Sequence, residues 1–109
     1  MGMMIARGNP IDSKELNMAD FFISGIRREK PGGHIQQVQV IRSGKAVRMT
    51  ADRAFVADLI TLGKTTFQTI FWENNAWRYG AHVHVVDGEY LATDRNARKE
   101  DNLESLPTF

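Results

Sequence analysis

Two histidines separated by a single residue are the side chains in this sequence best suited to metal chemistry. His82 and His84 lie in a segment of strand composition, and alternate residues of a strand point to the same face of a sheet. Their imidazoles therefore share one face, while Val83 and Val85 point to the other. A metal site needs at least a third ligand. The candidates are His34, Asp87 and Asp94, but the sequence alone brings none of them close to the pair. His82 and His84 are thus a candidate metal pair, and the alternative is that both rings line the polar face of a strand.

Basic residues gather in the first half of the chain. Residues 24–53 include seven basic and two acidic residues, a net charge of +5, whereas residues 87–109 include six acidic and three basic residues, a net charge of −3. A basic surface is the electrostatic requirement for binding nucleic acid. The candidate nucleic-acid-binding residues are Arg27, Arg28, Arg42 and Arg48. The alternative is that the acidic tail lies near the basic strands and neutralises them.

Three aromatic residues, Trp72, Trp77 and Tyr79, surround a predicted hairpin turn at Asn74-Asn75. Aromatic rings at such positions can stack on bases or contact a protein partner. More often, such residues form cross-strand pairs within a sheet or belong to the core. We treat them as a candidate interaction surface, but the sequence places them in a different hairpin from the basic residues.

No motif for catalysis is present. The chain lacks a P-loop, a dinucleotide-binding glycine pattern and the common hydrolase and metalloprotease motifs. It also lacks cysteine, which excludes disulfides, thiolate catalysis and cysteine-based metal centres and favours a cytoplasmic location. We therefore predict no catalytic residue, no cofactor and no membrane span. The favoured interpretation is a non-enzymatic binding or interaction module. Its expected partner is another protein or a second copy of the chain, bound through an exposed strand edge or the aromatic hairpin, and the alternative partner is nucleic acid.

The pattern of apolar residues and turns predicts an α+β fold. We expect a mostly antiparallel sheet of about five to seven strands and one amphipathic helix, in the order β-β-(β)-α-β-β-β-β. Tight turns between the strands favour antiparallel pairing. The predicted strands span residues 20–29, 34–42, 65–73, 76–79, 82–86 and 89–93, with a further short segment at 46–49.

The predicted helix covers residues 51–62. Thr50 is the expected N-cap, and Gly63 is the expected residue that ends the helix. Apolar residues recur along the helix at a spacing that forms one stripe. They are Phe55, Val56, Leu59, Ile60 and Leu62.

The length of 109 residues allows one domain. Residues 1–18 are polar and without sustained periodicity, so we predict a flexible N-terminal extension there. Residues 19–109 then form a single α+β domain that includes the C-terminal tail. Leu103, Leu106 and Phe109 are the apolar residues expected to hold that tail against the core.

Several segments together resemble a known family. The first is the strand from Phe22 to Arg28 followed by Gly33-His34-Ile35, and the second is the hairpin from Val83 to Leu91 followed by Thr93-Asp94. The third combines Asp101-Asn102-Leu103 with the ending Leu106-Pro107-Thr108-Phe109. In these segments the chain resembles the bacterial DUF3892 family over about residues 18–109. The resemblance implies a stand-alone domain whose C-terminal segment belongs to the fold, and it implies no activity or catalytic residue.

Overall fold

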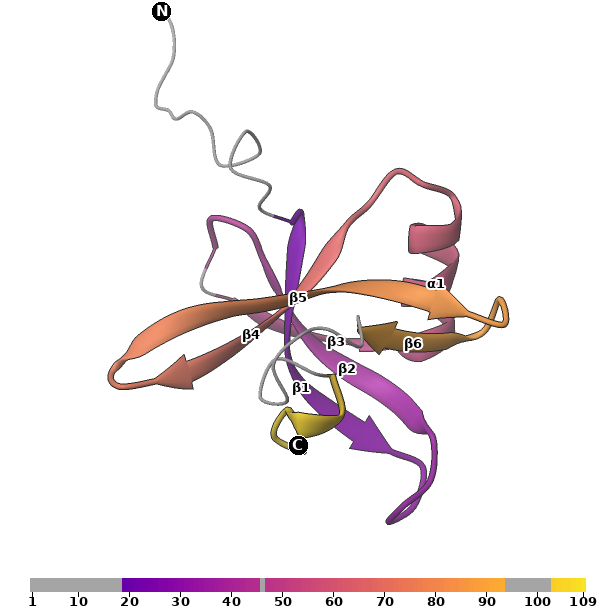
Figure 1. Ribbon diagram of the computed structural model, residues 1–109, viewed down its shortest axis with the longest axis horizontal. Helices are drawn as coiled ribbons and strands as arrows, with labels where there is room; N and C mark the ends of the chain where they lie inside the picture. The colour runs from indigo at the N-terminus through magenta and orange to yellow at the C-terminus, as the bar shows by residue number, and fades with distance from the viewer. Residues whose placement is uncertain (1–18, 46, 94–102) are drawn as a thin grey trace, which may run out of the picture.

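The structure is a computed structural model that describes residues 19–45, 47–93 and 103–109. The predicted flexible extension at residues 1–18 lies outside the described residues. Six strands, one α-helix and one short 3₁₀ helix form the described fold (Figure 1). In chain order they are β1 (Phe21–Arg28), β2 (Ile35–Arg42), β3 (Arg48–Asp52), α1 (Arg53–Thr61), β4 (Phe67–Glu73), β5 (Ala76–Val86), β6 (Tyr90–Thr93) and η3 (Leu103–Ser105).

The strands form one mixed sheet in the order β3-β2-β1-β4-β5-β6. All neighbouring strands pair antiparallel except β1 and β4, which are parallel. The predicted α+β class, with one helix and a mostly antiparallel sheet, is therefore confirmed. The parallel pair joins two antiparallel halves, one on each side of the centre of the sheet.

The parallel pairing is short, and a group of hydrogen bonds holds its beginning. Only residues 21–23 of β1 pair with residues 67–69 of β4. Just before the pair, the amide of Asp20 donates to the Thr66 hydroxyl (3.1 Å), and the amide of Thr66 donates to the Asp20 carboxylate (3.0 Å). Phe21 and Phe67 then stack with ring centroids 5.4 Å apart. These contacts fix the register between the two halves of the sheet.

One face of the sheet packs against α1 and holds the main core. Ile23 and Ile26 of β1 and Val38 of β2 are almost completely buried there. Val56 and Ala57 of α1 are buried against them. Complete burial of an Ile or Val side chain contributes about 1.5–3 kcal/mol to the free energy of folding. The opposite face, which we call the helix-free face, has only a small buried cluster of Ala19, Phe22 and Ile70.

The two predicted hairpin turns are confirmed in their backbone conformation. Asn74 and Asn75 between β4 and β5 have φ values of 53° and 63°. Asp87 and Gly88 between β5 and β6 have φ values of 56° and 67°. Positive φ at both central residues is the conformation of a type I′ turn, which matches the twist of the flanking strands.

The predicted number of strands after the helix is wrong. The sequence suggested separate strands at residues 76–79 and 82–86, but β5 runs through both segments as one strand. The irregularity expected at Gly80 is a shift in register against β4, where Gln68 pairs with His82 and Ile70 pairs with Tyr79. A bulge bends a strand without ending it.

The predicted start of the helix is also wrong. Thr50 pairs with Gln39 inside β3, which continues to Asp52, so α1 begins only at Arg53. Asp52 occupies the N-cap position without a side-chain capping bond. The five-residue ladder between β2 and β3 takes the residues that a longer helix would have used.

Among the described residues, no helix has the length and apolar character needed to cross a membrane.

The later start of the helix changes which residues it buries. Val56 and Ala57 are buried, and Leu59 and Ile60 pack against the core while partly exposed. Phe55, expected in the apolar stripe, is 59% exposed. Leu62 lies just beyond the last helical residue and is 69% exposed, while Gly63 ends the helix with a φ of 76° as expected.

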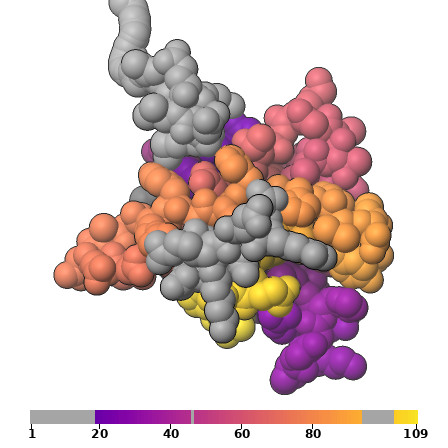
Figure 2. Space-filling view, in the orientation of Figure 1, coloured from indigo at the N-terminus to yellow at the C-terminus, as the bar shows by residue number. Residues whose placement is uncertain are grey.

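The C-terminal segment belongs to the core, as its apolar residues predicted. Leu103 and Leu106 are buried, and the C-terminal segment lies against the first hairpin (Figure 2). Thr108 forms a parallel bridge with Ile26 in the second half of β1. The Ile26 amide donates to the Pro107 carbonyl oxygen (2.9 Å). A Cβ atom at Gly25 would lie 3.1 Å from that same oxygen. A side chain at this position would therefore require the tail to shift by a few tenths of an ångström.

We expect Leu103→Ala to lower the free energy of unfolding by about 2–5 kcal/mol, because it leaves a cavity beneath the tail. Urea denaturation followed by circular dichroism measures this change. Leu62→Ala is the matched control, since its side chain is 69% exposed and should change stability by no more than about 0.5 kcal/mol. Equal effects of the two substitutions would contradict the burial of the tail.

Candidate functional site

The helix-free face brings together residues from opposite halves of the sheet. Arg48 on β3 and Trp77 on β5 are separated by four strand spacings, about 19 Å in a flat sheet. The Arg48 guanidinium nevertheless lies 5.7 Å from the centre of the Trp77 ring. The sheet must therefore be strongly twisted, so that the outer part of the β4–β5 hairpin comes close to β3. Figure 1 shows β5 running across the front of the central strands.

Two cavities lie between this hairpin and the sheet, and they share Arg48 and Trp77. Their volumes are about 320 and 300 Å³. We call the pair the aromatic groove. The first cavity is lined by Phe22, Ile41, Arg42, Gly44, Lys45, Arg48, Ile70, Trp77 and Tyr79. The second is lined by Ser24, Gly25, Gln39, Arg48, Phe71, Trp72, Trp77, Pro107, Thr108 and Phe109.

The charge of the groove is positive. Arg42, Lys45 and Arg48 line the groove, and no aspartate or glutamate side chain among the described residues lines it. Within the described parts of the chain, none of these three side chains forms an ion pair. Their charge is therefore available to an anionic ligand.

The aromatic rings of the groove are held by one another and remain accessible. Trp72 and Trp77 meet edge to face with centroids 5.3 Å apart, and Tyr79 rests on Phe22 with centroids 5.0 Å apart. Trp72 is 60% exposed, Tyr79 48% and Trp77 38%. These rings are thus ordered by their neighbours while much of their surface faces solvent.

The predicted basic residues divide between the groove and its surroundings. Arg42 and Arg48 line the groove itself. Arg27 lies beside it, where its guanidinium sits 4.5 Å from the centre of the Phe109 ring and donates to the main-chain oxygen of Phe109 (2.9 Å). Arg27 therefore positions a residue that lines the groove and also donates to Gln37.

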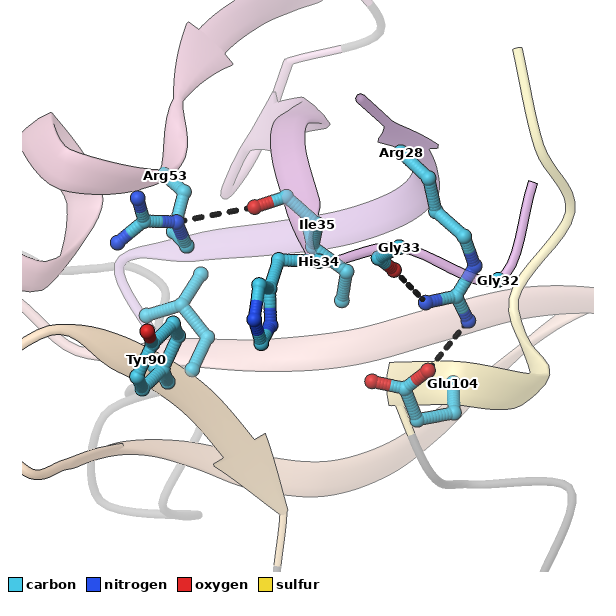
Figure 3. A pocket seen from close by; sticks show the side chains of 9 residues that line it. Arg28, Gly32, Gly33, His34, Ile35, Arg53, Tyr90 and Glu104 are labelled. Atoms are coloured by element: carbon cyan, nitrogen blue, oxygen red, sulfur yellow. Dashed lines mark hydrogen bonds and ion pairs between the residues drawn. The ribbon is translucent and has the colours of Figure 1, made fainter. Parts of the chain in front are cut away.

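Arg28 points away from the others into a separate cavity (Figure 3). Its guanidinium donates to the Gly33 carbonyl oxygen (2.9 Å) and forms an ion pair with Glu104 of η3. The alternative in which the acidic tail neutralises the basic strands thus holds for Arg28. It does not extend to Arg42 and Arg48 among the described residues.

His82 and His84 are both exposed on the helix-free face, whereas Val83 is buried and Val85 packs against the core on the other face. Their shared orientation follows the strand alternation that the sequence indicated. In the part of the chain that the structure describes, no group of three or more metal-ligating side chains is present. A metal bound by His82 and His84 stays a prediction.

Sequence reasoning missed several residues of the groove. Lys45 lies in the turn between β2 and β3, and it was counted only as part of the basic segment. The sequence predicts that Phe109 holds the tail against the core, and the structure also places Phe109 in the lining of the groove. The apolar ending Leu106–Phe109 was the available signal, though nothing local indicates which surface it reaches.

Comparison with known proteins agrees with the resemblance seen in the sequence. No curated protein and no solved structure matches the chain. The family model described as "Protein of unknown function (DUF3892)" matches residues 22–107. That match includes α1, η3 and all six strands, apart from the first residue of β1. The chain therefore belongs to the DUF3892 family.

Proposed function

We propose that this protein binds single-stranded nucleic acid in the aromatic groove. The observation that supports this most directly is the approach of Arg48 to Trp77 across the coiled sheet, at 5.7 Å. It places a cation and a stacking surface in the same concave site. Proteins that bind single strands without strong sequence preference combine these two features, with cations on the phosphates and aromatic rings on the bases.

The arrangement of charge supports a polyanionic ligand. Arg42, Lys45 and Arg48 approach the groove from the end of β2, the following turn and the start of β3. This spread along one side of the groove suits several phosphates of a strand better than one isolated anion. Each contact would displace a condensed counterion, so affinity would fall as salt rises.

The exposed rings support a single strand over a duplex. Trp72, Trp77 and Tyr79 line the opposite side of the groove from the turn that holds Lys45, and each leaves more than a third of its surface exposed. Unpaired bases present their faces for stacking, whereas a duplex buries them between neighbouring base pairs. Stacking contributes about 1–3 kcal/mol per base.

Binding is expected for a labelled oligonucleotide of about 12 nucleotides, a length within the range of small single-strand sites. Fluorescence anisotropy should show tighter binding to single-stranded DNA or RNA than to a duplex of the same length. Three phosphate contacts predict that log K falls with log salt at a slope of about −2. Absence of binding at about 50 mM salt would contradict the proposal, because phosphate contacts are strong there.

The two tryptophans provide an internal readout of the same titration. Trp72 and Trp77 are the only tryptophans of the chain, and both line the groove. Stacking of bases should therefore quench the intrinsic fluorescence in parallel with the anisotropy. Binding without quenching would place the nucleic acid elsewhere on the protein.

Substitutions should separate stacking from charge. Trp77→Ala is expected to weaken binding about 5- to 100-fold, the range for loss of one stacked base, while Trp77→Phe should retain most of the affinity. Arg48→Gln should reduce the magnitude of the salt slope by about 0.7, the value for one phosphate contact on a single strand.

Lys64→Gln is the matched control for charge, because Lys64 is exposed beyond the end of α1 and lines neither cavity of the groove. It should leave both affinity and salt slope unchanged. Equal losses for Arg48→Gln and Lys64→Gln would show that binding follows net charge and would reject the groove as the site. Light scattering on each variant checks that self-association is unchanged.

A further inference from the structure

A third cavity lies beside the start of α1, and its chemistry differs from that of the aromatic groove. Its volume is about 320 Å³, within the range of small-ligand pockets. The turn after β1, the start of α1, the start of β6 and η3 converge on it (Figure 3). Its lining residues are Arg28, Gly32, Gly33, His34, Ile35, Arg53, Tyr90, Leu91 and Glu104.

Arg53 is a partly buried cation without a carboxylate partner among the described residues. Its Nε donates to the Ile35 carbonyl oxygen (2.9 Å), one terminal nitrogen donates to the Glu89 carbonyl oxygen, and the guanidinium lies 5.4 Å from the centre of the Tyr90 ring. These contacts fix the group in place and use two of its five donors. The remaining donors and the full charge are available to a ligand.

The start of α1 increases the positive potential around Arg53. Arg53 is the first residue of the helix, and the first turn contains no acidic residue. The carboxylate of the N-cap residue Asp52 accepts a hydrogen bond from Gln37 (3.2 Å) and makes no capping bond to the helix amides. A cation at the positive end of a helix is electrostatically unfavourable. A bound anion next to the Arg53 guanidinium would relieve this repulsion.

The Arg28 end of the cavity already holds an oxyanion from the protein itself. The Glu104 carboxylate forms an ion pair with Arg28, and its side chain is 63% exposed. Arg28 is fixed by its hydrogen bond to the Gly33 carbonyl oxygen. The cavity therefore has the geometry to bind an oxyanion, and Glu104 occupies one of its two guanidinium groups.

His34 lies between the two arginines in the close view, and it stacks on Tyr90 with ring centroids 4.8 Å apart (Figure 3). Its ring nitrogens make no hydrogen bond within the described residues. Two guanidiniums and an imidazole line this cavity, and together they offer more donors than the two oxygens of a single carboxylate use, which favours a phosphate group with its three terminal oxygens. Ile35, Tyr90 and Leu91 add apolar wall for an organic portion of the ligand.

We infer that this cavity binds a small phosphomonoester, whose phosphate group is held by Arg53 and His34 and competes with Glu104 for Arg28. This site is independent of nucleic-acid binding in the aromatic groove. Arg42 and Arg48 line the groove and not this cavity, so variants of the two sites can be tested separately.

The test is a titration of the full chain with glycerol 3-phosphate, inorganic phosphate and acetate, followed by two-dimensional NMR of the His34 ring and the Arg53 Nε–H group. Glycerol 3-phosphate should give saturable shifts at both groups. Arg53→Gln should weaken binding about tenfold or more, as expected for a charge-assisted hydrogen bond to an anion. Arg42→Gln is the matched control and should bind as the unmodified chain does.

Glu104→Gln gives a result that a loss of folding cannot imitate. It removes the competing carboxylate while keeping the size of the exposed side chain, so binding of glycerol 3-phosphate should tighten several-fold. Unchanged or weaker binding by this variant would contradict the competition between Glu104 and the ligand. Absence of saturable shifts in the unmodified chain at about 10 mM ligand would contradict the site itself, because two guanidinium contacts should give a tighter affinity than that. Acetate binding as tight as that of glycerol 3-phosphate would overturn the assignment to a phosphate group.

Discussion

The short parallel pairing between β1 and β4 is the interaction on which the rest of the structure depends. It involves only residues 21–23 and 67–69, held at their start by the mutual hydrogen bonds of Asp20 and Thr66. Each half of the sheet is built from local antiparallel hairpins, which form between neighbours in sequence. Within the described strand ladders, the parallel pair is the junction between these halves. It closes a chain segment of more than forty residues, which has a substantial entropic cost.

The early end of that pairing creates both the site of the tail and the shape of the groove. Beyond Ile23, β4 leaves β1, and the second half of β1 accepts the C-terminal residues through Ile26. The β4–β5 hairpin, no longer held flat, crosses the helix-free face and brings Trp77 to Arg48. A longer parallel ladder would have filled the edge of β1 and kept the aromatic hairpin away from the basic strands.

The sequence predicted the local features of this fold well and the junctions poorly. Turns at Asn74-Asn75 and Asp87-Gly88 follow from residues that tolerate positive φ, which is a property of the residues themselves. The prediction of Thr50 as the N-cap was wrong because Thr50 pairs with Gln39, eleven residues earlier in the chain, and this pairing keeps it in β3. The irregularity predicted at Gly80 is present, but it does not divide the segment into two strands, because β5 continues through it.

The candidate sites depended on contacts that no local pattern encodes. Arg27 and Arg28 are adjacent in sequence, yet strand alternation sends one toward Phe109 near the groove and the other toward Glu104 in the separate cavity. The net charge of a segment cannot distinguish these outcomes, because neutralisation acts through individual pairs within a few ångströms. Glu104 reaches only Arg28 since the tail is fixed by its hydrogen bonds to Ile26. Among the described residues, Arg42, Lys45 and Arg48 therefore have no carboxylate partner that offsets their charge, and the proposed binding of nucleic acid rests on this condition.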